Sequence, residues 1–175
     1  ATGSATFQIA VCVEPLLDGR RYYIEVSRPP GLQTGTMIAG VVGPQFDPTL
    51  GPAWDASPYA WQINAWDGKV WHGGHGKWLS WEGCLSFTKG THGDKCGLLL
   101  DLMEGSMYLY LDGQRYGPIV QPRTLRGPLY WAVYSRGGNS LTVEAKPVPV
   151  IPARFDPRRC AEGVKLSADA ATMTA

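Results

Sequence analysis

Histidine and cysteine are the side chains of this sequence that could bind a metal ion. His72 and His75 are separated by two residues, a spacing that zinc ligands use. A tetrahedral zinc site needs a second closely spaced pair, and neither His92 nor the pair Cys84 and Cys96 supplies one at the usual spacing. Glycines before and after His75 also leave this segment with a flexible backbone. We therefore expect solvated histidines, no metal and no cofactor.

Carboxylates could carry glycoside hydrolysis, which needs two of them about 5–10 Å apart across the sugar bond. On a strand, such a pair would occupy alternate positions, whereas Asp101 and Glu104 are three positions apart across an expected turn. Asp94 and Asp101 fit a structural role, because aspartates at strand ends accept hydrogen bonds from backbone amides. The sequence contains neither a Gly-x-Ser-x-Gly elbow nor a Gly-x-x-x-x-Gly-Lys-Ser/Thr phosphate loop. It therefore predicts a protein that is not an enzyme and has no catalytic residues.

Aromatic side chains are the more informative group, with 7 Trp and 8 Tyr in the chain. Alternation with polar neighbours favours a core position for Trp61 and Trp71. Trp54 and Tyr59 instead flank a proline-rich segment, and Asp55 follows Trp54 directly. An aromatic ring held on a loop offers a large contact area at low entropic cost, which is typical of binding hot spots. We expect these residues to contact a partner.

The composition indicates a single domain built from short strands. Of 175 residues, 22 are Gly and 14 are Pro, together 36 or about a fifth, which is natural for many strands joined by turns. Hydrophobic residues make up 44%, enough for a core. The net charge of +1 gives no broad field, so nucleic acid and anionic membranes are poor partners. No run of about 20 apolar residues is present, so we expect no membrane span.

Runs of β-forming residues recur between turn residues and define the expected strands. These are Phe7–Val13, Arg21–Val26, Met37–Val42, Tyr59–Asn64, Cys96–Leu102, Ser106–Leu111, Leu129–Val133 and Leu141–Ala145. Asp67-Gly68 and Asp112-Gly113 are typical of tight hairpin turns. The continuous apolar sequence of the pair within Cys96–Leu111 predicts a hairpin at the centre of a sheet.

The two ends of the chain give expectations about its context. We expect a domain over residues 1–150 and an extension over 151–175, with a short helix near Asp156-Pro157 and a mobile tail from Leu166. Residues 1–6 lack the features of a signal peptide and an initiator Met, which favours a processed chain or a domain of a longer protein. Sparse cysteines predict free buried thiols in an intracellular, cytoplasmic setting, with a Cys84–Cys96 disulfide as the alternative.

Three segments resemble, in the same order, the central motifs of SPRY domains: Gly93–Asp101, Gly105–Gly113 and Gly127–Val133. The family pattern there runs Gly-Asp-x-x-Gly-hydrophobic-x-hydrophobic-Asp, then a strand, then an Asn-Gly turn, where this chain has Asp112 instead of Asn. Gly19–Val26 is similar to the early Gly-x-x-Tyr-Trp-Glu-Val strand of the family, with Tyr in the Trp place. The resemblance spans about residues 16–146 and is loose between 43 and 87.

The resemblance implies an all-β fold, a two-sheet antiparallel β-sandwich of the concanavalin A-like type with little helix. It also implies that the chain binds a protein or peptide, often as the recognition arm of a ubiquitin ligase, a scaffold or a channel complex. We expect a monomeric domain. Two other functions remain open: a carbohydrate-binding module, since Trp faces stack on sugars, and a glycoside hydrolase, which the fold permits.

The expected binding surface is a rim of loops, to which the implied topology adds a late turn. It comprises Gly43–Tyr59, His72–Lys77, Lys89–Asp94 and the turn Tyr134–Gly138. Arg136 on that turn could pair with a carboxylate of the partner. The side chains expected to contact the partner are Trp54, Asp55, Tyr59, His75, His92, Tyr134 and Arg136.

Overall fold

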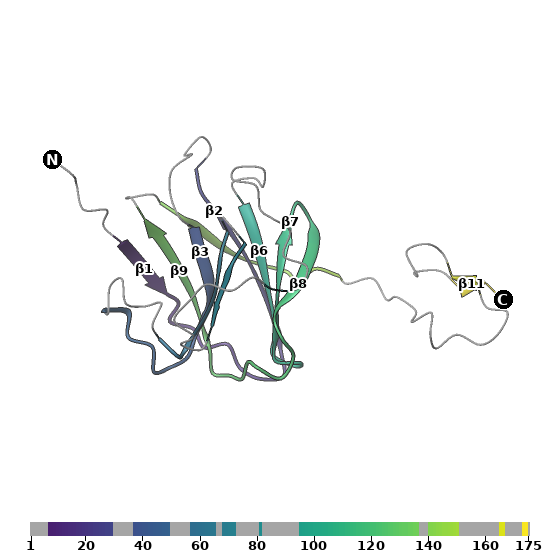
Figure 1. Ribbon diagram of the computed structural model, residues 1–175, viewed down its shortest axis with the longest axis horizontal. Coiled ribbons are helices and arrows are strands. Elements are labelled where there is room, and N and C mark those ends of the chain that lie inside the picture. Colours follow the sequence, from purple (N-terminus) through teal and green to yellow (C-terminus); the bar gives the residue numbers. More distant parts are fainter. Residues whose placement is uncertain are drawn as a thin grey trace.

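Two five-stranded antiparallel sheets make up most of the described chain (Figure 1). The computed structural model describes residues 7–29, 37–49, 57–65, 68–72, 81, 95–136, 140–150, 165–166 and 173–174. Within these ranges there is a short 3₁₀ turn at residues 48–49 and no α-helix, so the expected all-β class is confirmed. Among the same residues, no helix has the length and apolarity needed to cross a bilayer.

The first sheet has the strand order β1-β9-β3-β4-β5. Its strands are β1 (Phe7–Val11), β9 (Tyr130–Arg136), β3 (Met37–Val42), β4 (Ala60–Asn64) and β5 (Val70–His72). The central strand β3 is buried along its whole length. Its uninterrupted apolar sequence predicts burial on both faces, and the structure confirms it.

The second sheet has the strand order β10-β2-β6-β7-β8. Its strands are β10 (Thr142–Lys146), β2 (Arg21–Ser27), β6 (Lys95–Asp101), β7 (Ser106–Leu111) and β8 (Gln114–Val120). The β6–β7 hairpin occupies interior positions, as its continuous apolar pattern predicts. A short antiparallel pair, β11 (Lys165–Leu166) with β12 (Met173–Thr174), belongs to neither sheet, and the sequence does not predict it. The expected domain boundary at residue 150 stays a prediction.

Side chains of both sheets fill the space between them and form the main core. Ile63 from the first sheet and Leu98 from the second have no exposed surface there. Trp71 is buried as predicted, and the half-buried Trp61 packs against the main core. Trp131 is buried as well. The two sheets therefore pack face to face as a sandwich.

A second apolar cluster lies on the opposite, outer face of the first sheet. Its members are Ile38, Val42, Phe46, Ala60, Ala132 and Tyr134. Phe46 reaches this cluster from the segment after β3, where its N–H donates to the carbonyl of Gly43 at 3.0 Å. The first sheet is therefore packed on both of its faces.

Strand β8 is absent from the sequence-based prediction for a physical reason. Gly117 and Pro118 interrupt its pattern, but β8 is an edge strand, where a proline is tolerated because it removes no ladder hydrogen bond. The preceding turn confirms the prediction, since Asp112 and Gly113 adopt left-handed φ values of 50° and 78°.

The cysteines differ from expectation in one place. Cys96 is a free thiol within the main core, so the alternative of a Cys84–Cys96 disulfide is wrong. Cys12 is free but exposed, because it follows an edge strand instead of entering the core. Burial in apolar surroundings raises the pKa of the Cys96 thiol to about 12.

Candidate functional site

The strand register divides the expected rim between the two ends of the sandwich. At one end of the first sheet, Val42 lies opposite both Ala60 and Tyr130, which places the Gly43–Tyr59 segment there. Arg136 ends β9 at the other end, six residues further along the strand, or about 20 Å away. The described ends of these two segments therefore leave the first sheet at opposite ends, whereas the sequence-based expectation placed both on one rim.

The other two expected rim segments also leave from opposite ends. His72 lies opposite Trp61, so the His72–Lys77 segment begins at the end that carries Tyr59. Lys95, which follows the Lys89–Asp94 segment, begins β6 at the end away from Leu102. Leu102 accepts a hydrogen bond from the N–H of Gly19 at 3.2 Å, near the Tyr59 end. The candidate site therefore consists of the end that carries Tyr59.

Tyr134 lies inside β9 and not on a turn. It pairs with Ile9 on one side and Ile38 on the other, and its exposed fraction is 4%. The strand continues to Arg136 because the chain keeps alternating between the two packed faces of the sheet. The expectation that Tyr134 contacts a partner is therefore wrong, and the residue belongs to the second apolar cluster.

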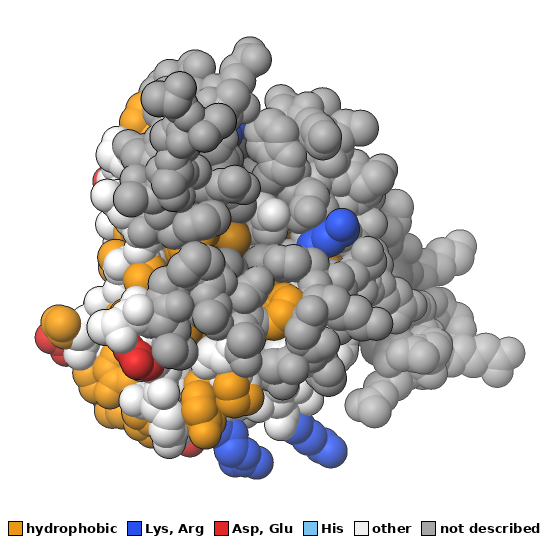
Figure 2. All heavy atoms as spheres, turned by 60° about the vertical axis from the view of Figure 1, so that its left-hand side comes forward, with side chains coloured by type: hydrophobic (Ala, Val, Ile, Leu, Met, Phe, Trp, Pro, Cys, Tyr) orange, Lys and Arg blue, Asp and Glu red, His pale blue; other side chains and the backbone are white. Residues whose placement is uncertain are grey.

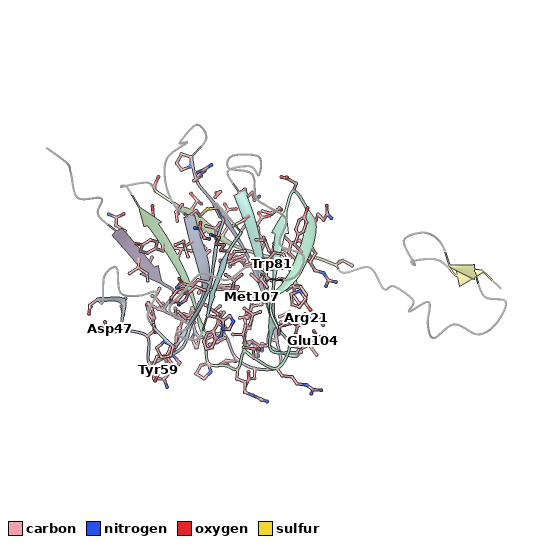
Figure 3. All side chains as sticks on the ribbon, viewed as in Figure 1. Arg21, Asp47, Tyr59, Trp81, Glu104 and Met107 are labelled. Carbon is pink, nitrogen blue, oxygen red and sulfur yellow. The ribbon has the colours of Figure 1, made fainter. Side chains whose placement is uncertain are left out.

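Tyr59 is the predicted contact residue that the structure does place on the surface (Figure 3). Its side chain is 41% exposed at the end of the first sheet. Its carbonyl accepts the N–H of Gly43 at 2.7 Å, which continues the β3–β4 ladder by one step. Its own N–H donates to the Ser57 hydroxyl at 3.3 Å. The backbone of Tyr59 is thus fixed on both sides while the ring stays accessible.

A small hydrogen-bonded turn lies in the segment after β3, at Asp47 (labelled in Figure 3). The Asp47 carboxylate accepts hydrogen bonds from the Thr49 N–H at 2.8 Å and from the Thr49 hydroxyl at 2.7 Å. These bonds, the hydroxyl first, hold the pKa of Asp47 below its ordinary value. Asp47 therefore stays charged at neutral pH and places an exposed acidic group on the segment after β3.

The remaining predicted contact residues fall outside what the structure describes. Trp54, Asp55, His75 and His92 lie in undescribed segments, and the backbone of Arg136 is described without its side chain. Among the described ranges, no group of three or more His, Cys, Asp or Glu side chains could hold a metal ion.

The outer face of the second sheet carries an arrangement that sequence reasoning did not single out. Tyr23 lies against Gly97 and meets Tyr110 edge to face, with ring centroids 5.3 Å apart at 74°. The Lys95 ammonium donates to the Glu25 carboxylate at 2.6 Å beside them. These residues line a cleft of about 210 Å³. Strand alternation predicts that they share a face, but the close approach of the Tyr23 ring to Gly97 depends on the missing Cβ there, which a pattern of apolar residues does not reveal.

Burial raises the pKa of Tyr23 to about 12, and the nearby Glu25 carboxylate adds to the shift. Burial also raises the pKa of Tyr110, against the opposing charge of Arg115. Both phenols are therefore neutral at physiological pH, and the cleft presents hydroxyl groups instead of phenolates.

Comparison with known proteins identifies the fold. No family model matches the sequence, and no curated protein matches it. A human SPRY domain matches with a TM-score of 0.60 and 22% identity over 81% of this chain and 86% of that one. The SPRY domain of human HERC1 matches with a TM-score of 0.58 and 13% identity over 84% of this chain and 87% of that one. Stonustoxin matches with a TM-score of 0.56 and 19% identity over 80% of this chain and 22% of its own. The chain has the SPRY fold, as the sequence motifs indicate.

Proposed function

We propose that this chain is a protein-interaction module that binds a peptide or a small protein surface at the end that carries Tyr59. The observation that supports it most directly is the contrast within Tyr59, whose backbone is fixed by two hydrogen bonds while its ring is 41% exposed. A rigid exposed tyrosine loses little conformational entropy on binding and buries a large amphipathic surface.

The surroundings of Tyr59 fit a contact that combines an apolar anchor with polar neighbours. Asp47 supplies a charged group that stays ionised, and Phe46, which precedes it, packs onto the outer face of the first sheet. Figure 2 shows hydrophobic side chains beside isolated charged ones on the described part of one face. A mixed surface of this kind is typical of protein–protein contacts, in which an apolar centre is surrounded by polar groups.

A role in substrate recognition for a ubiquitin ligase or a scaffold is the finer part of the proposal. The SPRY motifs of the sequence imply it. An intracellular location is proposed with it, because the exposed thiol of Cys12 is free and would tend to oxidise outside a reducing compartment.

Site-specific crosslinking tests the proposed surface. A photoreactive benzoylphenylalanine replaces Tyr59 in one sample and Val150, which is 91% exposed, in a control sample. We expect a crosslinked protein from position 59 alone, and weaker binding of that purified protein to Y59A by about 1–3 kcal/mol. A glycan array and a hydrolysis screen run in parallel. Binding of sugars with no protein crosslink at position 59 would favour a lectin and reject the proposal.

A further inference from the structure

Strand β1 is an edge strand of the first sheet, and β10 is an edge strand of the second. On β10, Val143 lies opposite Val26, a residue of the main core, and so points to the inner face of the sheet. Its side chain is nevertheless 42% exposed. The second sheet therefore presents an inward-facing apolar side chain that the first sheet does not cover.

The edge strand of the first sheet has the same property. Ala10 of β1 lies opposite Val133 of β9, which packs against the main core. Gln8 lies opposite Ser135 on the same face. Ala10 and Gln8 are exposed although they face inward. Both edges of the sandwich thus leave inner-face positions unfilled on this side.

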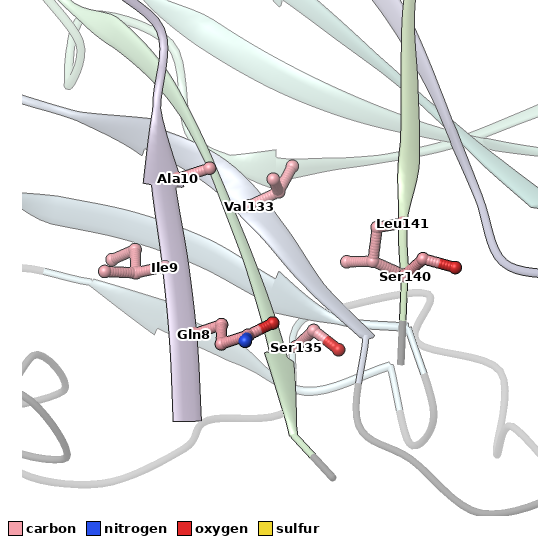
Figure 4. A pocket seen from close by; sticks show the side chains of 7 residues that line it. All are labelled: Gln8, Ile9, Ala10, Val133, Ser135, Ser140 and Leu141. Carbon is pink, nitrogen blue, oxygen red and sulfur yellow. The ribbon is translucent and has the colours of Figure 1, made fainter. Parts of the chain in front are cut away.

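A groove of about 620 Å³ occupies this opening (Figure 4). It is lined by Gln8, Ile9, Ala10, Val133, Ser135, Ser140 and Leu141. Figure 4 shows Ala10 and Val133 together on one side, with Leu141 on the segment that leads into β10 across from them. The described part of this lining carries no charged side chain. An occupant that suits the groove is therefore uncharged and carries apolar side chains of moderate size.

Among the described strands, β1 has a neighbour on one side alone, and its other edge specifies the backbone conformation of that occupant. The Cys12 N–H donates to the Trp131 carbonyl at 2.8 Å, which fixes which residues of the strand face β9. Along an antiparallel strand, successive residues alternate between turning their backbone N–H and C=O groups toward the neighbouring strand and turning them away. The N–H and C=O groups of Ile9 and Val11 therefore point away from β9. An edge of this kind is a template for one more strand.

We propose that β1 and its groove form a second docking surface, which accepts an extended, uncharged segment of another protein with alternating apolar side chains. The segment pairs with Ile9 and Val11 through its main chain. Its alternate side chains enter the groove between Ala10 and Leu141. This surface is distinct from the end that carries Tyr59, so the two proposals stand on different residues.

A second copy of this chain fits the groove less well. If β1 pairs with β1 of a second copy around Ile9, the residues opposite Gln8 and Ala10 are Ala10 and Gln8 of that copy. One alanine and one glutamine leave most of an apolar groove of about 620 Å³ unfilled. A different sequence with larger apolar residues at those positions fills it.

A synthetic probe tests the proposal with the full chain. The probe is the peptide acetyl-Ser-Val-Thr-Val-Ser-Val-Thr-amide, and its control has the same composition with the three valines adjacent. We expect the alternating peptide to bind saturably and to slow hydrogen exchange at the amides of Ile9 and Val11 at least tenfold. It should also shift the methyl resonances of Val133 and Leu141, and the control peptide should do neither.

Two variants locate the binding. Ile9→Pro removes the outward N–H of Ile9, together with a side chain that packs against the second apolar cluster. Ser140→Trp places a large ring at the mouth of the groove from an exposed position. Both should abolish binding while circular dichroism shows an intact sheet, and Tyr59→Ala should bind the peptide normally. If I9P fails to fold, S140W decides alone. Equal binding by folded variants, equal binding of both peptides, or a dimer that I9P dissolves would each overturn the proposal.

Discussion

The Arg21 guanidinium donates from Nε to Oδ2 of Asp101 at 2.6 Å, joining neighbouring strands of the second sheet. The other carboxylate oxygen of Asp101 accepts the N–H groups of Met103 and Glu104 at 3.0 and 3.2 Å. Asp101 is 2% exposed, so a single buried carboxylate fixes both the strand pair and the turn that follows β6. This is the structural role that its position at a strand end predicts.

Replacing Asp101 with Ala should lower the free energy of unfolding by about 1–3 kcal/mol, because two amides and one guanidinium lose their acceptor. Urea unfolding followed by tryptophan fluorescence measures the change. The exposed neighbour Glu104 is the matched control, and E104A should stay within about 0.5 kcal/mol of the parent. Equal effects of the two substitutions would contradict the assigned role.

Gly97 and Gly40 each lie so close to a neighbour that a larger side chain has no room, and the neighbour differs between the two. A Cβ at Gly97 would overlap the ring of Tyr23, whereas a Cβ at Gly40 would overlap the carbonyl of Trp61 and lie 2.7 Å from the Cα of Gln62. We expect G97A to cost about 1–3 kcal/mol and G40A about 3 kcal/mol or more, since backbone cannot move aside as a ring can.

A double-mutant cycle separates these two cases. Tyr23→Ala should restore most of the stability lost in G97A, measured by thermal unfolding, because the ring that obstructs the new methyl group is gone. The same substitution should leave the G40A loss unchanged. Additive effects of G97A and Y23A would refute the contact between them.

The pKa of Tyr23 predicts a dependence of stability on alkaline pH. Its folded-state pKa of about 12 lies above the ordinary value of 10.0, so folding favours the protonated phenol. This contribution is fully present below pH 10 and is lost as the pH rises from 10 through 12. Y23F should show a shallower decline of the unfolding midpoint over that window than the parent. In an alkaline titration followed by absorbance at 295 nm, Y23F should show one tyrosine fewer ionising near pH 12 than the parent protein does.

The two described cysteines should differ in reactivity. Cys12 is exposed, whereas burial raises the pKa of Cys96 to about 12 and shields it from reagents. In a background of C84S and C160S, Ellman's reagent should titrate one thiol in the native protein and two in denaturant. Rapid modification of both thiols without denaturant would show that the core opens easily.

Tyr59 and Trp131 should respond oppositely to truncation. Trp131 is 8% exposed within the main core, and W131A should cost about 3–5 kcal/mol of stability. Y59A should change stability by less than about 0.5 kcal/mol while weakening partner binding. A large loss of stability in Y59A would place the ring in the core and remove it from the candidate site.

The sequence predicts the strands of this protein better than it predicts the site. Continuous or alternating apolar patterns identify β3, β6 and β7 because burial acts directly on residue type. The sequence pattern does not predict strand β8, because an edge strand can contain residues such as Gly117 and Pro118 that interrupt the pattern of a strand.

The rim is harder to predict because it depends on which strand ends meet. Tyr134 and Tyr59 are both tyrosines next to expected loops, yet one is 4% exposed and the other 41%. The difference comes from register, since β9 continues past Tyr134 to Arg136 while β4 begins after Tyr59. Neither residue type nor local spacing carries that information. The open side between β1 and β10 is hidden for the same reason, because Ala10 and Val143 look like ordinary strand residues.

The pairing of β1 with β9 has a consequence for how this protein is made. Phe7 lies opposite Arg136 and Leu16 opposite Leu129, so the first strand has no partner until nearly the whole sandwich has been synthesised. At about 5–20 residues per second, a nascent chain waits on the order of ten seconds with this strand unpaired. Folding on the ribosome must therefore finish late, and a chain that stalls before β9 emerges leaves both β1 and β3 without the strand that joins them, exposed to chaperones.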